Sequence, residues 1–374
     1  MTKTTYNVGA THASPLPDGW RWVKLEEVCE FQYGSGLIQE LRQGEGNIPV
    51  YGSNGVVGYH DTALTAGPTI IIGRKGSIGE VHFSSAPCFP IDTTYFVDSV
   101  KLPVYLEWLA YILQTLRLPK LNKASGVPGL NRNDVYKLKI TLPPFSEQQR
   151  LTRVLREQMA AVEKARTAAK ARLEAALALP VSFVNESLTT GLTRRYSLDD
   201  CLIEVRNGIG AEWSKYPVLG ATREGLAPAK EGVGKAPGRY KLVDPVTVFY
   251  NPMRILLGSI AMVDEGDTPG ITSPDYVVVK GRPGILDTRW FYHWFRSAYG
   301  AHLVESLSRG AVRERILYNR LSAGEIDLPD YNVQKRVSEG VRHTRDFIEP
   351  LTKELDTINA LPAALLRRAF NGGL

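Results

Sequence analysis

The sequence predicts an α+β protein in which two similar mixed α/β domains with small twisted sheets are separated by two long antiparallel helices forming a coiled coil. Three observations predict this architecture. One long helical pattern lies near the middle of the chain, a second lies at its C-terminal end, and the segments between them repeat. With 374 residues and 43% hydrophobic content, the chain can form two such cores. We therefore expect a pseudo-two-fold arrangement within a single chain.

The first helical pattern runs from Ser146 to Leu179. It contains no Gly or Pro and is rich in residues that lose little conformational freedom in a helix. Ser146, three residues before Gln149, is typical of an N-cap. Its 34 residues would span about 51 Å. One face is apolar except at Arg166, and so needs a partner helix: Leu155, Met159, Val162, Ala169, Leu173 and Ala176.

The second helical pattern repeats the layout of the first. IDLPDYNVQKR, from Ile326, matches ITLPPFSEQQR, from Ile140, and both patterns continue to a Leu-Pro pair. Its apolar or small positions recur in steps of four and three: Val337, Val341, Thr344, Ile348, Leu351, Leu355 and Ile358. Because each helix has one such face, we expect the two helices to pack against each other.

Between the helices, short β-type runs alternate with Gly-rich turns, which is typical of small twisted sheets. YPVLGATREG from Tyr216 matches IPVYGSNG from Ile48, and VTVFYNPMRILLGSIAMV from Val246 matches TIIIGRKGSIGEV from Thr69. One helix expected from Thr288 matches an amphipathic helix expected from Leu102. The expected parts are a first sheet domain (1–145), a central helical region (146–194), a second sheet domain (195–331) and a C-terminal helical region (332–374).

Composition excludes several classes of protein. Cys29, Cys88 and Cys201 are too few and odd in number for a disulfide framework, and no Cys or His pair has zinc-ligand spacing. No apolar run reaches the length of a membrane span, and the residues before Asp18 contain no apolar signal region, so we expect a cytoplasmic protein. A net charge of +6 permits a polyanionic partner without requiring one.

No catalytic motif is present in the sequence. A phosphate-binding Gly-rich loop, a nucleophile elbow, a His-Glu-x-x-His helix and a Cys-x-x-Cys pair are all missing. Asn251 and Pro252 match only the first two positions of the Asn-Pro-Pro-aromatic motif of amino-group methyltransferases, so we interpret them as a turn. His293, set among aromatic residues, is interpreted as a packed side chain. The sequence therefore predicts a binding protein that holds no cofactor or metal.

Basic and polar residues in the loops of the first half suit nucleic acid. Arg74 and Lys75 precede Gly76 in a tight turn, where a guanidinium can reach guanine O6 and N7. The first-half candidates for DNA binding are Asn54, Arg74, Lys75, Ser77, Lys120, Lys123, Asn131 and Arg132. Among them, Lys120 and Lys123 are expected to contact phosphates, which position a protein without carrying sequence information.

The second half carries cations at matching places. These candidates are Arg223, Arg254, Arg309, Arg313 and Arg315. For any single residue, a solvated charged rim explains the charge equally well. Recurrence at corresponding places in both halves favours nucleic-acid binding for the set.

Three segments carry a resemblance to a known family: LPDGWRWVKLEEVC near the start, ASGVPGLNRNDVYKLKITLPPFSEQQR before the first helix, and LPAALLRRAFNGGL at the end. The chain resembles the DNA specificity subunit of a type I restriction-modification system. The resemblance implies two target-recognition domains, each reading one half of an interrupted site in double-stranded DNA, and spacer helices that fix the gap.

The resemblance also implies the partners. In that family the specificity subunit is non-catalytic and recruits two methyltransferase subunits and, with them, restriction/translocase subunits. S-adenosylmethionine, ATP and Mg are expected in those other subunits.

Two alternatives remain from the sequence alone. A non-catalytic two-domain adaptor that binds proteins predicts no salt-sensitive affinity for DNA. An enzyme assembled from residues outside known motifs predicts turnover by the purified chain. A DNA reader instead predicts binding that weakens steeply as salt rises.

Overall fold

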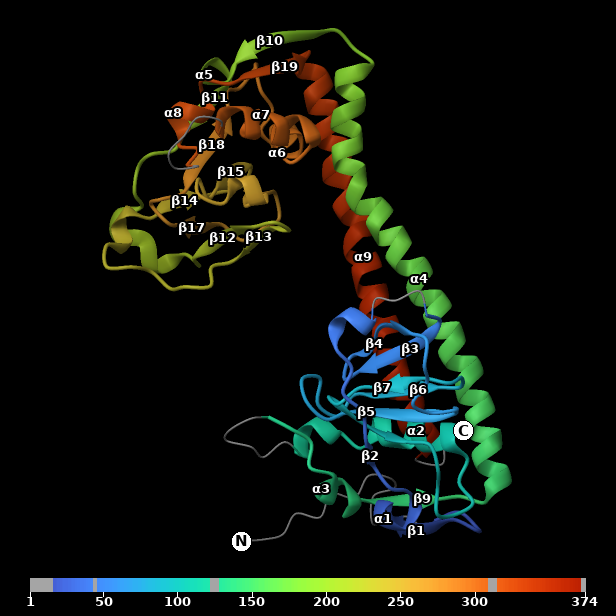
Figure 1. Cartoon of the computed structure of the whole chain (residues 1–374). Coiled ribbons are helices and arrows are strands. Elements are labelled where there is room, and N and C mark those ends of the chain that lie inside the picture. Colours follow the sequence, from blue (N-terminus) through green and yellow to red (C-terminus); the bar gives the residue numbers. More distant parts are fainter. Residues whose placement is uncertain (1–15, 43–45, 122–127, 309–314, 371–374) are drawn as a thin grey trace. The chain divides into compact units, whose positions relative to one another are not determined.

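The computed structural model describes residues 16–42, 46–121, 128–308 and 315–370 (Figure 1). The chain forms two compact units. Unit 1 is Met1–Ala168 together with Leu355–Leu374, and unit 2 is Ala169–Glu354. Each unit contains a sheet domain and part of two long helices, α4 (Phe145–Thr189) and α9 (Tyr331–Phe370). No helix in the described ranges is both long enough and apolar enough to span a membrane.

Unit 1 is built around a four-stranded antiparallel sheet in the order β2-β8-β5-β6. Its strands are β2 (Gln32–Tyr33), β5 (Thr69–Gly73), β6 (Val81–Ser84) and β8 (Thr94–Val97). Helix α2 (Leu106–Thr115) packs against β5 and β6 and contributes the fully buried Trp108 to the core. Burial on both faces explains why every residue of β5, TIIIG, is buried.

Smaller elements complete unit 1. They are β1 (Arg21–Lys24) paired with β9 (Lys139–Leu142), the sheet β4-β3-β7 (Gly55–His60, Ile48–Gly52, Phe89–Pro90), α1 (Leu25–Val28), α3 (Arg132–Tyr136), η1 (Gln39–Arg42) and η2 (Leu118–Leu121). Strands β3 and β7 form the parallel pair, and β3 and β4 form a hairpin whose turn carries Asn54.

Unit 2 repeats the central sheet in the order β11-β18-β15-β16. The strands are β11 (Leu202–Glu204), β15 (Thr247–Tyr250), β16 (Ile260–Val263) and β18 (Val277–Gly281). Two-stranded ladders pair β10 with β19 (Thr193–Ser197, Glu325–Pro329), β12 with β13 (Leu219–Thr222, Gly225–Pro228) and β14 with β17 (Lys241–Val243, Gly270–Thr272). The helices are α5 (Leu198–Cys201), α6 (Thr288–Phe295), α7 (Ala298–Ser308), α8 (Tyr318–Leu321), η3 (Gly210–Lys215), η4 (Pro237–Arg239) and η5 (Ile255–Leu257). The predicted repeat of two small mixed domains is confirmed.

Helix α4 is longer than the sequence pattern indicated. It begins at Phe145, so Ser146 lies in its first turn and is not the cap, and the Gln148 N–H donates to the Pro144 carbonyl at 3.0 Å. It also continues through Pro180, where a backbone donor is missing. Burial of Val184, one turn further on, in the core of unit 2 compensates for that lost hydrogen bond.

The two long helices share a core within each unit. In unit 1, Leu155 near the start of α4 and Phe370 at the end of α9 belong to one cluster around Trp108. In unit 2, Val184 near the end of α4 and Val337 near the start of α9 belong to another. Every seam position predicted from the sequence is buried or half-buried. The predicted antiparallel pairing is therefore confirmed.

The helix expected from Thr288 is divided in two. Helix α6 ends at Phe295, and the Ser297 hydroxyl accepts a hydrogen bond from the Tyr299 N–H at 3.2 Å at the start of α7. Gly300 approaches α6 so closely that a Cβ on it would lie 2.3 Å from the Phe295 carbonyl oxygen. Phe295 and Gly300 are five residues apart, so this is a local break, which helical periodicity alone did not reveal.

A buried glutamine ties the start of α4 to the sheet domain of unit 1. The side chain of Gln148 is 1% exposed. Its Oε1 accepts from the N–H of Tyr105, just before α2, at 2.8 Å, and its Nε2 donates to the Pro143 carbonyl at 3.0 Å. The amide therefore joins the end of β9, the start of α4 and the start of α2.

Unit 2 contains the same arrangement. Gln334, also 1% exposed, accepts from the N–H of Asp287 at 2.9 Å and donates to the Pro329 carbonyl at 2.9 Å. Asp287 caps α6, accepting from the Trp290 N–H at 3.0 Å. The Gln of the repeated LPPFSEQ and LPDYNVQ segments is thus a structural clamp in both units.

We expect Gln148→Ala to lower the free energy of unfolding by about 1 to 3 kcal/mol, because buried backbone groups such as the Tyr105 N–H lose their partner. Urea unfolding should show the lower midpoint, and hydrogen exchange should show faster exchange at the Tyr105 amide. The exposed neighbour Gln149 provides the matched control, Gln149→Ala. Equal effects of the two variants would contradict a clamp.

Candidate nucleic-acid interface

Three segments of unit 1 meet at one end of the central sheet. The Leu130 N–H donates to the Arg74 carbonyl at 2.9 Å, joining the segment after residue 127 to the β5–β6 turn. A Cβ on Gly76 would lie 3.1 Å from Ser53 Oγ, so the β3–β4 hairpin reaches the same turn. The structure thus brings together the three sequence segments that carry Asn54, Arg74 and Arg132.

Tyr33 lies between two of the predicted arginines. The guanidinium carbon of Arg74 is 5.3 Å from the centroid of its ring, and that of Arg132 is 5.1 Å from it. Arg74 also donates to the Asp92 carbonyl at 2.6 Å, and Arg132 to the Phe31 carbonyl at 2.9 Å. These cation–π contacts and hydrogen bonds fix both guanidinium groups, while Tyr33 remains 53% exposed.

Tyr95 packs against the Tyr33 ring that contacts Arg74 and Arg132. Its ring centroid is 5.1 Å from that of Tyr33, and its hydroxyl donates to the Leu130 carbonyl at 3.0 Å. Burial raises the pKa of the Tyr95 hydroxyl, so it remains a protonated donor at neutral pH. Strand β8 is thereby joined to the segment that carries Asn131 and Arg132.

The remaining unit 1 candidates differ in their surroundings. Asn54, Lys75 and Lys120 are exposed, and Ser77 is half-buried. Asn131 caps α3, its Oδ1 accepting from the Asn133 N–H at 2.9 Å, so part of its hydrogen-bonding capacity is already used. Lys123 lies outside the described residues.

Unit 2 brings the equivalent segments together. The Ser259 hydroxyl donates to the Ala221 carbonyl at 2.7 Å, joining the β15–β16 connection to the β12–β13 hairpin, whose turn carries Arg223. The Ile316 N–H donates to the Pro252 carbonyl at 3.0 Å, as the Leu130 N–H does to Arg74 in unit 1. Exposed Arg223 and Arg254 and half-buried Arg315 belong to these segments, whereas Arg309 and Arg313 lie outside the described residues.

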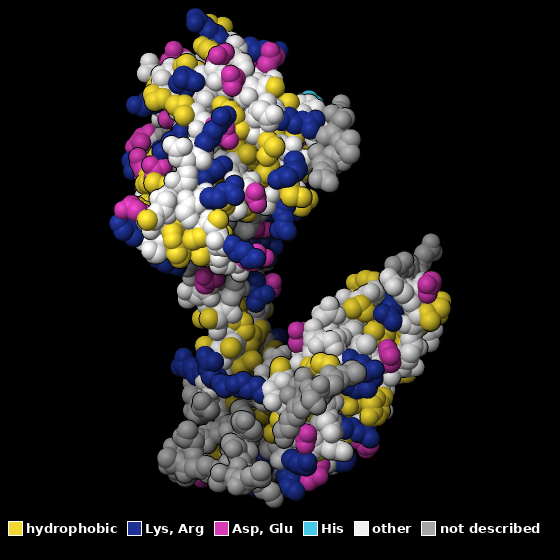
Figure 2. Space-filling view, turned by 90° about the vertical axis from the view of Figure 1, so that its left-hand side faces the viewer, with side chains coloured by type: hydrophobic (Ala, Val, Ile, Leu, Met, Phe, Trp, Pro, Cys, Tyr) yellow, Lys and Arg dark blue, Asp and Glu magenta, His cyan; other side chains and the backbone are white. Residues whose placement is uncertain are grey.

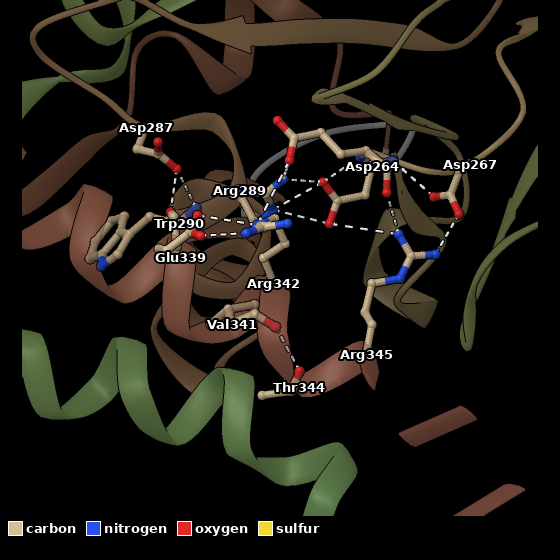
Figure 3. A network of polar contacts seen from close by, with 12 residues as sticks. Asp264, Asp267, Asp287, Arg289, Trp290, Glu339, Val341, Arg342, Thr344 and Arg345 are labelled. Carbon is tan, nitrogen blue, oxygen red and sulfur yellow. Dashed lines mark hydrogen bonds and ion pairs between the residues drawn. The ribbon is translucent and has the colours of Figure 1, made fainter. Parts of the chain in front are cut away.

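An ionic network holds the β16–β17 loop of unit 2 against its helices (Figure 3). Arg289 of α6, with its side chain 8% exposed, donates from Nε to both carboxylate oxygens of Asp264, at 2.9 and 3.0 Å. Arg345 of α9 bonds to Asp267 at 2.5 Å. The acids of this loop are therefore matched by arginines, as buried charges require.

Burial explains the shifted pKa values of His293, Cys29 and Cys201. Burial lowers the pKa of His293 to about 4, with Arg296 and Arg289 also nearby, so His293 is neutral at pH 7. Burial raises the pKa of the Cys29 thiol to about 12 and that of Cys201 to about 11, which leaves both as unreactive thiols. Within the described residues, no group of three or more His, Cys, Asp or Glu side chains could hold a metal ion.

The surface carries charges of both signs. On the face seen in Figure 2, Lys and Arg side chains are interspersed with Asp, Glu and hydrophobic ones in each unit. Sequence reasoning found the cations but missed Tyr33, although FQYGSG places an aromatic residue beside a Gly-rich turn. That local signal does not reveal which arginines the ring contacts.

Comparison with known proteins identifies the class of protein. Residues 17–170 match the model of the type I restriction modification DNA specificity domain. No curated protein sequence is significantly similar to the chain. The matched residues include every unit 1 candidate, from Asn54 to Arg132.

Solved structures share the fold over nearly the whole chain. The type I restriction-modification S subunit from M. genitalium is 14% identical with a TM-score of 0.57, and the match covers 98% of this chain and 99% of that one. A chain from a structural study of complex assembly and conformational transition of the type I R-M system is 15% identical with a TM-score of 0.64. That match covers 96% of this chain and 100% of the other.

Residues 17–170 thus belong to the type I restriction-modification DNA specificity domain family, as the sequence motifs predicted. The model that these residues match is described as a DNA specificity domain. The whole chain has the fold of the solved S subunits.

We expect Tyr33→Ala to weaken DNA binding about tenfold, because removing the ring frees the Arg74 and Arg132 guanidiniums. Tyr33→Phe keeps the ring and should bind as the wild type does. Fluorescence anisotropy measures the affinity of both variants for a duplex that contains the recognition site found by methylation mapping. Equal losses in the two variants would instead assign the effect to the hydroxyl.

Proposed function

We propose that the chain is the specificity subunit of a type I restriction-modification complex, and that each sheet domain reads one half of a bipartite DNA site. One observation carries the proposal: three loop segments that bear arginine or asparagine side chains converge in the same way in both units, on sheets of the same strand order. The unit 1 copy lies inside the matched specificity domain. We take residues 1–145 and 195–331 as the two target-recognition domains.

In this proposal some loop residues contact bases and others contact the phosphate backbone. Arg74 and Arg132, held by Tyr33, contact guanine in the first half-site, and Asn54 and Asn131 contact base edges nearby. Lys75, Ser77, Lys120 and Lys123 contact the phosphate backbone. In the second half-site the corresponding contacts come from Arg223, Arg254, Arg309, Arg313 and Arg315.

The helical regions 146–194 and 332–374 act as spacers and as docking sites for two methyltransferase subunits, which in turn recruit restriction/translocase subunits. Leu177 of α4 and Phe347 of α9, 54% and 41% exposed, leave apolar surface on the helices for such partners. S-adenosylmethionine, ATP and Mg belong to those subunits. The assembly acts on cytoplasmic DNA.

Arg74→Ala tests base reading by unit 1. We expect methylation mapping to show relaxed specificity in one half-site only, at a cost of about 1 to 3 kcal/mol for a bidentate guanine contact. Exposed Arg21 on β1 provides the control, Arg21→Ala. If the variant instead loses affinity equally for all DNA sequences, and its affinity depends less steeply on salt, Arg74 contacts a phosphate. Salt-insensitive binding by the wild type would favour a protein-binding adaptor.

Deleting Ala168–Ala171, one turn of α4, tests the spacer. Four residues correspond to about 6 Å of helix, or about two base pairs, so the unread gap should change in length while both half-sites keep their bases. Methylation sequencing of DNA from cells carrying the variant complex reads both properties at once. Ala168→Gln with Ala171→Gln keeps the helix length and is the control. Altered bases within a half-site would refute the spacer role.

A further inference from the structure

The turn after the central strand differs in chemistry between the two units. In unit 1 the β5–β6 turn begins with Arg74 and Lys75. In unit 2 the β15–β16 connection contains η5 and begins Asn251-Pro252-Met253-Arg254. Both connections reach a glycine with left-handed backbone followed by Ser-Ile, namely Gly76 with φ of 73° and Gly258 with φ of 81°. The residues before this shared glycine are cationic in unit 1 and mainly apolar in unit 2.

The apolar turn of unit 2 exposes its side chains. Leu257 is 71% exposed, Met253 67% and Leu256 40%, whereas Ile255 is 3% exposed and anchors the turn in the core. A large apolar side chain left in water forgoes the favourable free energy of burial. Several such residues on one short turn therefore indicate a surface that becomes covered by a partner.

Local hydrogen bonds make this turn a fixed feature. Asn251 Oδ1 accepts from the Met253 N–H at 3.0 Å, and the Gly258 N–H donates to the Ile255 carbonyl at 2.8 Å. The Ser259 N–H donates to the Arg254 carbonyl at 3.2 Å. The exposed side chains are consequently presented from a closed turn, which lowers the entropic cost of binding.

Cations flank the apolar turn. Arg254 belongs to the turn itself, and the Cγ of Arg223 would lie 3.6 Å from a Cβ on Gly258. Both arginine side chains are exposed. An exposed apolar turn that carries Arg254 and lies beside Arg223 fits a polyanion that also offers an apolar group, and this combination favours DNA over a protein surface.

We propose that Leu257 and Met253 contact the 5-methyl group of a thymine in the half-site read by unit 2. Thymine alone among the four bases presents an apolar group in the major groove. The corresponding turn of unit 1 presents Arg74, which the proposed function assigns to guanine, so each turn is assigned to the major groove of its own half-site. This inference rests on the proposed function and adds that the second half-site contains thymine.

The test uses the chain assembled with its methyltransferase subunits and a duplex whose site is known from methylation mapping. The half-site unaffected by Arg74→Ala is assigned to unit 2. Replacing its thymines one at a time by deoxyuridine removes a single methyl group, and we expect about a fourfold loss of affinity at one position. Leu257→Ala should weaken binding to the thymine duplex by at least this factor. The variant should then bind the thymine and uracil duplexes with equal affinity.

Ile203→Ala is the matched control, since Ile203 is 42% exposed and lies on β11, at the edge of the unit 2 sheet opposite β16. It should bind like the wild type and keep its sensitivity to uracil. A half-site without thymine, or wild-type affinity unchanged by every uracil replacement, overturns the inference. If uracil replacement leaves the affinity unchanged and 2-aminopurine fluorescence shows an unstacked base step, the apolar side chains of the turn would instead insert between bases as a wedge. Loss of sequence-specific binding at both half-sites would refute the proposed function itself.

Discussion

The buried amides of Gln148 and Gln334 are the contacts on which the frame of each unit depends. A glutamine amide donates and accepts at once, so each can bridge a backbone carbonyl and a backbone N–H belonging to different elements. Because each side chain is 1% exposed, no water replaces a lost partner, and the geometry is strongly enforced. The start of each long helix is thereby fixed to the helix that packs on the central sheet of the same unit.

This shared frame explains why the candidate interfaces of the two units correspond. Strands β5 and β15 occupy the same place in sheets of the same order, and each leads into a turn joined by backbone hydrogen bonds to a later segment. The frame determines where a turn lies, and the side chains of the turn determine what it can contact. Tyr33 adds rigidity in unit 1, since a ring between two guanidiniums keeps the cations apart and oriented.

Much of this was predictable from the sequence because the signals are local or repeated. Strand patterns, Gly-rich turns and the Leu-Pro-containing helix starts indicated the repeated fold, and residue chemistry with recurrence in both halves suggested Asn54, Arg74 and Arg132 as candidates. The structure brings the segments that carry them together. The exceptions do not follow from periodicity. Pro180 stays helical because Val184 is buried in the core of unit 2, and α6 ends at a local break where Gly300 approaches Phe295. Tyr33 was missed because its place beside Arg74 depends on the pairing of β2 with β8, which no local pattern encodes.

Placing specificity in turns has a consequence for stability. Residues such as Leu257 and Lys75 are exposed, so replacing them removes few core contacts, whereas Ile255 and Ile72 hold the flanking backbone from within the core. A turn can therefore gain residues, as the η5 connection has relative to the β5–β6 turn, while the strands and the glutamine clamp remain unchanged. One frame can then carry a cationic turn in one unit and an apolar turn in the other. Two domains with the same fold can thus read chemically different half-sites.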